Sequence, residues 1–297
     1  MLTAEYLVLE GAKALALPTN FGQQMTITEN SSSDINWTSY DHKNAVWFSA
    51  KFSLYDFKSV ETTDQAIAEK ITKLLKGCAR QDSEFLSQWK GQKVETHLDF
   101  NREWGLGTSS SLVYCIADWA DVSPYQLIMD TFGGSGYDVA CAGADGPILY
   151  SINDYAISIE EALFNPSFAK NLFFIYLGKK QNSQEEVERF KKTSKYIASD
   201  INEVSGLTEA FNTCKNLTDF QKLMVEHEQL ISRIINMPKI KQISFSDFDG
   251  EIKSLGAWGG DFILAATLQS KEYVERYFMS KGLKDILTYD ELILKRK

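Results

Sequence analysis

A cluster of glycine, serine and threonine residues at positions 101–112 is the sequence feature that most strongly limits which fold this chain can adopt. Its sequence is N-R-E-W-G-L-G-T-S-S-S-L. In front of it, apolar and polar residues alternate over positions 94–100, which predicts a half-buried strand. Behind it, apolar residues recur at helical spacing over positions 112–120, which predicts a helix. The cluster therefore joins a strand to the N-terminus of a helix.

The start of such a helix favours a bound anion. The first backbone N–H groups have no partner within the helix, glycine allows a ligand to approach them, and the helix dipole favours negative charge there. A capped helix after an ordinary turn fits the same residues, because serine is a common N-cap and glycine is common in turns. The stretch by itself leaves both interpretations open.

Composition and charge narrow the class of protein. The 297 residues, 44% of them hydrophobic, suffice for two modest domains or one large one. The formal net charge of −9, without a Lys/Arg-rich block, argues against a nucleic-acid-binding surface. No apolar run approaches the ~20 residues of a membrane span, and the N-terminus lacks the basic and apolar regions of a secretory signal. A cytoplasmic protein without membrane partners is the expectation.

The cysteines and histidines give no sign of a metal site. The four cysteines lack C-x-x-C spacing, which indicates neither a zinc site nor a disulfide framework. The three histidines are not at metal-ligand spacing, and we assign none of them a role.

The remaining pattern predicts a mixed α+β chain of two domains, residues 1–158 and 159–297. We expect strands at residues 6–11, within 24–57, and at 172–177, 262–266 and 292–294, and helices at 63–77, 220–234 and 272–281. In this scheme Thr63 caps its helix and Gly77 ends it.

Two more glycine clusters follow. Residues 133–136 place three glycines and a serine just before Asp138, and residues 256–260 precede the strand at 262–266. The first cluster is also typical of a loop in which Asp138 forms an Asx-turn or caps a helix. The second is also typical of an ordinary hairpin turn.

Taken together, the three clusters resemble the motifs of the GHMP kinases, the superfamily of galactokinase, homoserine kinase, mevalonate kinase and phosphomevalonate kinase. Residues 2–11 are similar to the motif G-K-x-x-L-x-G-E-[HY], residues 105–111 to G-L-G-S-S-A-A, residues 135–138 to S-G-x-D, and residues 256–261 to G-A-G-G-G-[DG]. The Glu5-Tyr6 pair, the D-V-A after Tyr137 and the closing G-G-D look most similar to phosphomevalonate kinase, with mevalonate kinase as the near neighbour.

This resemblance implies an N-terminal α/β domain with a phosphate loop, a ferredoxin-like C-terminal domain, and ATP and Mg²⁺ as cofactors. The backbone of Gly105, Leu106, Gly107, Thr108, Ser109 and Ser110 would bind the ATP phosphates. Ser109 would reach the metal, with Thr108 as the near alternative. Asp138 would act as the catalytic base or orient the acceptor hydroxyl. Gly256, Ala257, Gly259 and Gly260 would form the C-terminal glycine loop that closes over the phosphates or the acceptor.

The implied activity is ATP-dependent phosphorylation of a small hydroxylated, anionic metabolite of the mevalonate pathway of isoprenoid biosynthesis, by a monomer or homodimer. The resemblance places Glu5 and Tyr6 at the substrate. Lys179, Lys180 and Ser183 are candidates for the acceptor's anionic group, although a solvated lysine pair fits the first two as well.

The sequence departs from the family pattern at several positions. Ala4 replaces a glycine, Trp258 interrupts the last glycine run, and the Mg²⁺-binding glutamate of mevalonate kinases has no clear match. By alignment the lysine of the first motif falls ahead of Met1. Either the native chain starts further upstream, or the protein lacks this lysine and is a slow or inactive kinase.

Alternatives are a nucleotide-binding pseudokinase with a regulatory or assembly role, and a GHMP kinase for homoserine or a sugar. A dinucleotide-binding oxidoreductase fails, because Ser110 stands where G-x-G-x-x-G needs its third glycine.

Overall fold

The computed structural model describes residues 1–153, 156–179, 183–256 and 258–296. These residues form two compact units. Unit 1 comprises Met1–Asn20, Glu103–Gly105 and Ala144–Lys297, and unit 2 comprises Phe21–Arg102 and Leu106–Gly143. Both helices and strands occur in each unit, as the sequence predicts.

Unit 2 is a five-stranded sheet packed against helices. Its elements, with the short helix η2 that leads into unit 1, are β2 (Gln23–Asn30), β3 (Asp34–Tyr40), β4 (Val46–Ser53), β5 (Ser59–Thr62), α1 (Gln65–Gln81), β6 (Gly91–Leu98), η2 (Arg102–Trp104), α2 (Thr108–Trp119), α3 (Pro124–Thr131) and α4 (Tyr137–Ala142). The strand order is β2-β6-β3-β4-β5, in which β3 and β6 are parallel and the other pairs antiparallel.

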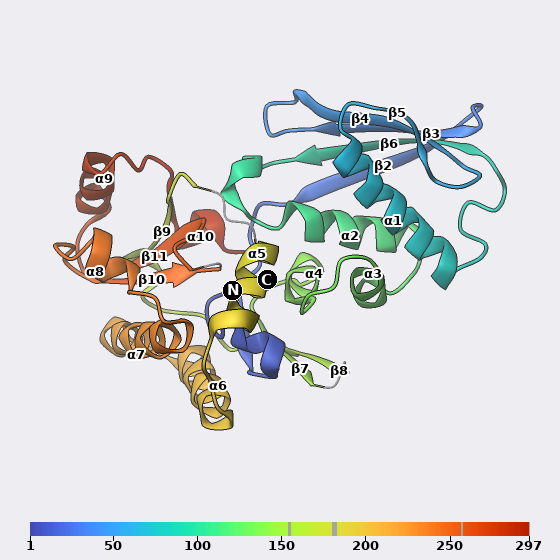
Figure 1. Ribbon diagram of the computed structural model, residues 1–297. Coiled ribbons are helices and arrows are strands. Elements are labelled where there is room, and N and C mark those ends of the chain that lie inside the picture. Colours follow the sequence, from blue (N-terminus) through green and yellow to red (C-terminus); the bar gives the residue numbers. More distant parts are fainter. Residues whose placement is uncertain (154–155, 180–182, 257, 297) are drawn as a thin grey trace. The chain divides into compact units, whose positions relative to one another are not determined.

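The core of unit 2 lies between this sheet and its helices, and α1 and α2 lie along one face of the sheet (Figure 1). Alternate residues of the strands, such as Trp37, Phe48 and Val94, are buried there. The apolar stripe of α1, including Ile71 and Leu75, packs onto them. This packing fixes the start of α2 next to the end of the sheet.

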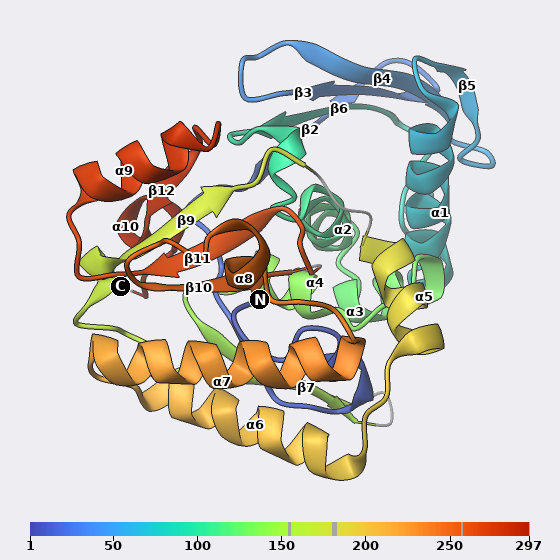
Figure 2. The same ribbon diagram turned by 60° about the vertical axis from the view of Figure 1, so that its left-hand side comes forward.

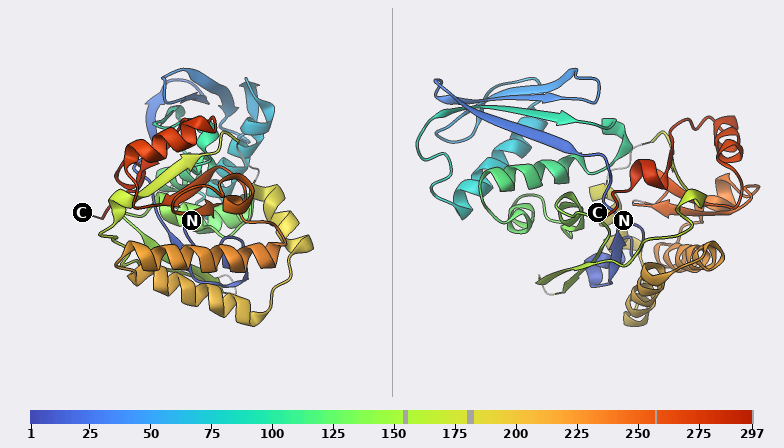
Figure 3. Two further views of the ribbon diagram at one scale, coloured as in Figure 1. Left: turned by 90° about the vertical axis from the view of Figure 1, so that its left-hand side faces the viewer. Right: turned by 180° about the vertical axis from the view of Figure 1, so that it is seen from behind.

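Unit 1 contains two smaller sheets. Its elements are η1 (Leu7–Glu10), β1 (Ala14–Ala16), β7 (Ile148–Asn153), β8 (Ala156–Glu161), η3 (Ala169–Asn171), β9 (Leu172–Tyr176), α5 (Ser183–Thr193), α6 (Ala198–Thr213), α7 (Leu217–Ile235), α8 (Ile240–Ser244), β10 (Glu251–Leu255), β11 (Phe262–Ala266), α9 (Lys271–Ser280), β12 (Ile286–Thr288) and α10 (Tyr289–Leu292). The long helices α6 and α7 lie side by side (Figure 2). The sheet β1-β7-β8 is next to η1 (Figure 3).

The larger sheet of unit 1 is ferredoxin-like, as predicted. Its order is β10-β11-β9-β12 and every pairing is antiparallel. Numbered along the chain, the four strands are therefore ordered 2-3-1-4, with helices between the first and second and between the third and fourth. On one face, Phe173, Ile175 and Ile263 pack against Val274 and Phe278 of α9.

Several predicted local features are wrong. Residues 6–11 are not a strand, because Ala4 and Tyr6 have left-handed φ angles of 65° and 63° and the chain turns into η1. Gly77 does not end α1, which continues to Gln81. Asp64 caps α1 in place of Thr63, its side chain accepting a hydrogen bond from Ile67 N.

The C-terminus differs as well. The expected strand at residues 292–294 does not form, because Leu292 is the last residue of α10, which carries a capping box between Thr288 and Glu291. Only Ile293 pairs in β fashion, with Thr19. The compact units also differ from the consecutive segments 1–158 and 159–297, because residues 1–20 and 144–158 group with the C-terminal part. The boundary at residue 158 stays a prediction about sequence domains.

No helix among the described residues is both long and apolar enough to cross a membrane.

Candidate active site

The glycine and hydroxyl cluster forms a loop and the first turn of α2, as the sequence predicts. Gly107 is the N-cap and has a left-handed φ of 80°, and no side chain caps the helix. The first helical hydrogen bond runs from Ser111 N to Gly107 O at 2.9 Å. The N–H groups of Thr108, Ser109 and Ser110 precede that bond, so they have no acceptor within the helix.

The hydroxyl groups of this turn differ in their surroundings. Ser111 donates within the turn, to Gly107 O at 3.1 Å, and lies 3.0 Å from Gln23 Oε1. Ser109 is exposed to solvent. A helix start with uncapped N–H groups and an accessible hydroxyl suits an anion such as a phosphate. It also suits a metal ion shared between phosphate oxygens and one hydroxyl.

Gly105 lies against a carboxylate of unit 1. Its φ is 67°, and a Cβ atom placed on it would be 2.2 Å from Asp261 Oδ2. Any side chain at this position would collide with Asp261. The glycine therefore permits a close approach that no other residue allows.

Asp138 is in the first turn of α4, which also begins after a left-handed glycine, Gly136. Within unit 2, α4 packs against α2. The Asp138 side chain is exposed to solvent. The protein around this carboxyl nevertheless reduces its hydration and raises its pKa, and a hydrogen bond from the Tyr137 side chain opposes the shift.

The third glycine cluster is the turn of the β10–β11 hairpin. Leu255 pairs with Phe262, and residues 256–261 connect them. Gly256 and Gly259 have left-handed φ angles of 69° and 70°, and nothing lies within 4 Å of a Cβ placed on either. Gly260 is buried. Ala257 lies outside the described residues.

Three residues are candidates for binding the anionic group of the acceptor: Lys179, Lys180 and Ser183. Lys179 follows β9 and is exposed. Lys180 lies outside the described residues, and Ser183 is the first residue of α5.

Glu5 and Tyr6 have partners inside unit 1. Glu5 is 3% exposed, and its Oε1 forms an ion pair with the fully buried Lys253 of β10. Tyr6 Oη accepts a hydrogen bond from Trp258 N at 2.7 Å. Removal from water raises the pKa of Tyr6 to about 12, so its hydroxyl is neutral at physiological pH.

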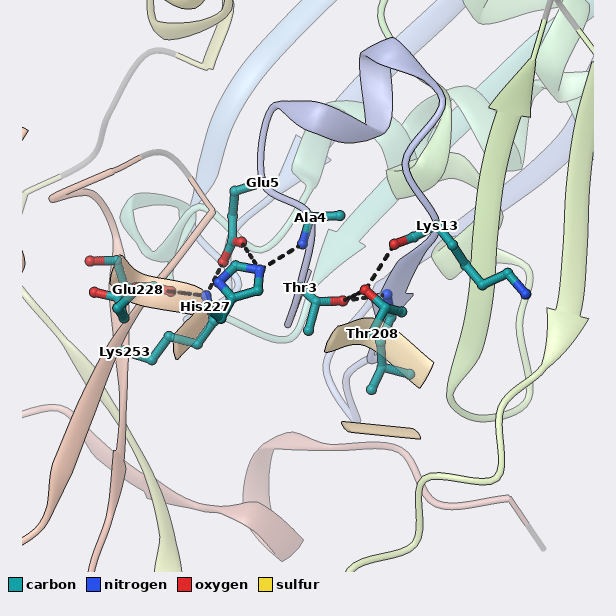
Figure 4. A network of polar contacts seen from close by, with 10 residues as sticks. Thr3, Ala4, Glu5, Lys13, Thr208, His227, Glu228 and Lys253 are labelled. Carbon is teal, nitrogen blue, oxygen red and sulfur yellow. Dashed lines mark hydrogen bonds and ion pairs between the residues drawn. The ribbon is translucent and has the colours of Figure 1, made fainter. Parts of the chain in front are cut away.

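A buried polar network surrounds Glu5 (Figure 4). Lys253 Nζ also lies 3.7 Å from Glu228 Oε1 and donates to Ser254 O at 3.0 Å. Ser254 N donates to Glu228 Oε1 at 3.1 Å. Ala4 N donates to Nε2 of His227 at 3.0 Å, and the same nitrogen is 3.3 Å from Glu5 Oε2.

Burial and charge set the protonation of this network. Removal from water raises the pKa of Glu228 to about 8, although the positive charge of Lys253 favours the ionised form. The pKa of His227 is well below its usual value, first because the ring is buried and second because Lys253 is close. A neutral His227 that accepts from Ala4 N at Nε2 carries its proton on Nδ1.

The described residues contain no cluster of three or more histidine, cysteine, aspartate or glutamate side chains that could hold a metal ion by itself. A magnesium ion at the start of α2 would therefore need phosphate oxygens as ligands in addition to Ser109.

The predicted site residues divide between the two units. Unit 2 contains Leu106, the start of α2 and Asp138, whereas unit 1 contains Gly105, Glu5, Tyr6, Lys179 and the C-terminal glycine loop. Sequence reasoning missed Lys253 and Glu228. The one signal for Lys253 is a lysine between Ile252 and Ser254 inside a strand, and nothing in the sequence pairs it with a residue 248 positions away.

Among the comparisons with known proteins, only the one with solved structures finds matches, and it shows the fold of this chain. No family model matches the sequence. No curated protein matches it either. Among solved structures, the mevalonate kinase of Methanococcus jannaschii gives a TM-score of 0.68 at 18% identity, over 96% of this chain and 93% of that one.

Two further solved kinases are as similar. The phosphomevalonate kinase of Streptococcus pneumoniae, in complex with phosphomevalonate and AMPPNP, gives a TM-score of 0.69 at 17% identity over 96% of each chain. The galactokinase of Lactococcus lactis, complexed with galactose, gives 0.67 at 12% identity over 99% of this chain and 91% of that one. The chain therefore has the fold of the GHMP kinases along nearly its whole length.

Proposed function

We propose that the protein is an ATP-dependent kinase of a small hydroxylated, anionic metabolite, of the phosphomevalonate or mevalonate kinase type. The observation that carries this proposal is the start of α2. There, uncapped N–H groups follow the left-handed Gly107 and an exposed Ser109 stands in the first turn. Such a turn, in a fold that these small-molecule kinases share, suits the phosphates of a nucleotide.

In the proposed reaction, residues 105–110 hold the phosphates of ATP. The glycines allow close approach, and the N–H groups of Thr108, Ser109 and Ser110 donate to phosphate oxygens. Bound Mg²⁺ would neutralise phosphate charge, with the Ser109 hydroxyl as its protein ligand and Thr108 as the alternative.

Asp138 would serve the acceptor. Its carboxylate takes the proton of the acceptor hydroxyl while the hydroxyl oxygen forms a bond to the γ-phosphorus and the bond to ADP breaks. A carboxyl whose pKa is raised is a stronger proton acceptor in its ionised form. Lys179, Lys180 and Ser183 remain our candidates for the acceptor's anionic group.

An assay of ADP release tests the proposal. Wild-type protein is incubated with ATP, Mg²⁺ and, in turn, mevalonate, phosphomevalonate, homoserine and galactose. We expect ADP release that depends on one of the two mevalonate compounds. Turnover only with homoserine or galactose would move the protein to another kinase specificity. Absence of turnover with all four would contradict the proposal, and ATP-dependent thermal stabilisation in that case would favour a pseudokinase.

A further inference from the structure

Two adjacent side chains near the N-terminus hold the β10–β11 hairpin at two points. Glu5 pairs with Lys253, which lies in β10 three residues before the C-terminal glycine loop (residues 256–260). Tyr6 accepts a hydrogen bond from the backbone of Trp258, inside that loop. The sequence resemblance places both residues at the substrate, but Glu5 Oε1 and Tyr6 Oη contact the hairpin.

The backbone of residues 4–6 makes this double contact possible. In an extended strand, successive side chains point to opposite faces, so Glu5 and Tyr6 would diverge. Instead Ala4 and Tyr6 both have left-handed φ angles, which non-glycine residues rarely adopt. Such strained residues persist only where surrounding contacts maintain them. Here Ala4 N donates to His227 Nε2, Glu5 pairs with Lys253, and Tyr6 accepts from Trp258 N.

Trp258 is held from two sides. Its indole is 3% exposed, and its Nε1 donates to Pro238 O at 3.0 Å. Its backbone N–H is used by Tyr6 and is not available to a ligand. The residue that interrupts the glycine run therefore anchors the loop, while the turn keeps open space at Gly256 and Gly259.

Tyr6 is itself fixed by aromatic packing. Its ring stacks on Phe190 of α5 with the ring centroids 5.2 Å apart and an interplanar angle of 14°. Phe190 is buried and also stacks with Tyr196, at 5.7 Å and 9°. This stacking restricts the orientation of the Tyr6 ring, so its hydroxyl oxygen stays within hydrogen-bond distance of Trp258 N.

We propose that Glu5 and Tyr6 are positioning residues that set the conformation of the C-terminal glycine loop. Glu5 acts through Lys253 at the end of β10 that leads into the loop, and Tyr6 acts through the Trp258 N–H within it. The effect on catalysis rests on the proposed function and on the closure of this loop over the phosphates or the acceptor that the sequence resemblance implies. The effect on loop conformation does not depend on it.

The test compares Tyr6→Phe with Tyr196→Phe. Both variants keep the aromatic stack and lose one hydroxyl, but only Tyr6→Phe removes the acceptor of Trp258 N–H. Backbone hydrogen exchange is followed in peptides covering residues 256–260, with peptides of α7 as a reference for overall folding. We expect exchange in the loop to be several-fold faster in Tyr6→Phe, and unchanged in Tyr196→Phe and in α7 of both variants.

Two results would overturn the proposal. Loop exchange unchanged in Tyr6→Phe would show that the hydroxyl does not hold the loop. Faster exchange throughout unit 1 would assign Tyr6 to general stability instead. With the acceptor found for the wild type, we further expect Tyr6→Phe to raise KM several-fold with a smaller change in kcat. If the wild type shows no turnover, the proposed kinase function fails while the exchange result still decides the role of Tyr6.

Discussion

At the scale of single residues, the buried charges around Lys253 are the most consequential feature of unit 1. Lys253 is fully buried and paired with Glu5, and Glu228 is nearby. A buried ion pair gains little over an apolar pair, but loss of one partner leaves an uncompensated charge. The cost of disrupting this network therefore depends on which member is removed.

Replacing Lys253 alone tests this reasoning. We expect Lys253→Met to lower the free energy of unfolding by about 3–5 kcal/mol, because Glu5 is left buried without its cation. The double variant Lys253→Met with Glu5→Gln should regain a large part of that loss. Urea denaturation of both proteins measures the difference. Equal stability of the single and double variants would show that the charge of Glu5 is not the cause.

Glu228 gives a prediction for pH dependence. Its pKa is raised from 4.5 to about 8, so the folded state binds its proton more tightly than the unfolded state. The resulting stabilisation is complete below pH 4.5 and is lost as the pH rises to about 8. The lowered pKa of His227 acts in the opposite sense, but only below its unfolded value of 6.5. From pH 6.5 to 8, therefore, the titration of Glu228 changes the free energy of unfolding and that of His227 does not.

In that window we expect wild-type stability to fall with rising pH more steeply than the stability of Glu228→Gln. The difference in slope should reach at most about 1.4 kcal/mol per pH unit, the value for one proton. Glutamine keeps an acceptor for Ser254 N, so the variant tests the titration rather than the hydrogen bond. Denaturation curves at several pH values measure the slopes, and parallel slopes would rule out the raised pKa.

At the scale of elements, α1 shows that a glycine near the end of a helical pattern can serve packing and need not end the helix. Gly77 lies inside α1, where a Cβ would be 2.5 Å from Leu127 Cδ1 of α3. It permits helix packing and does not end the helix. Gly206, in α6, is exposed, and a Cβ placed on it would have no neighbour within 4 Å. The two positions form a matched pair.

We expect opposite effects of alanine at these glycines. Gly206→Ala should stabilise the protein by about 0.5–1 kcal/mol through helix propensity. At Gly77 the same gain is opposed by overpacking against Leu127, which costs about 1–3 kcal/mol, so Gly77→Ala should destabilise. Thermal unfolding of the two variants measures the effects. Stabilisation of similar size at both positions would contradict the packing role of Gly77.

The elements with strong periodicity were predictable, and those set by distant contacts were not. The strand and helix on either side of residues 101–112, and α7 and α9, follow from alternation or helical spacing. The turn at residues 4–11 was missed, because Leu7 and Val8 suit a strand and the left-handed residues are held by partners distant in the sequence, such as His227 for Ala4 and Trp258 for Tyr6. The pairing of Glu5 with Lys253 has no local signature at all.

At the scale of the whole molecule, the fold is that of the GHMP kinases, and the likeness extends over nearly the full chain. Low sequence identity limits this finding to the fold. The proposed activity rests instead on particular groups: the uncapped start of α2, the Ser109 hydroxyl and the Asp138 carboxylate. A test of activity must therefore change those groups and leave the fold intact.

The most direct measurement is transfer of labelled γ-phosphate from ATP to the acceptor, for the wild type, Asp138→Asn and Ser109→Ala. We predict transfer by the wild type, a loss of about 10²-fold or more in kcat for Asp138→Asn, and a smaller loss for Ser109→Ala that excess Mg²⁺ partly restores. Each variant should unfold at nearly the wild-type temperature. Transfer by Asp138→Asn at the wild-type rate, or none by the wild type with any acceptor, would contradict the proposed kinase mechanism.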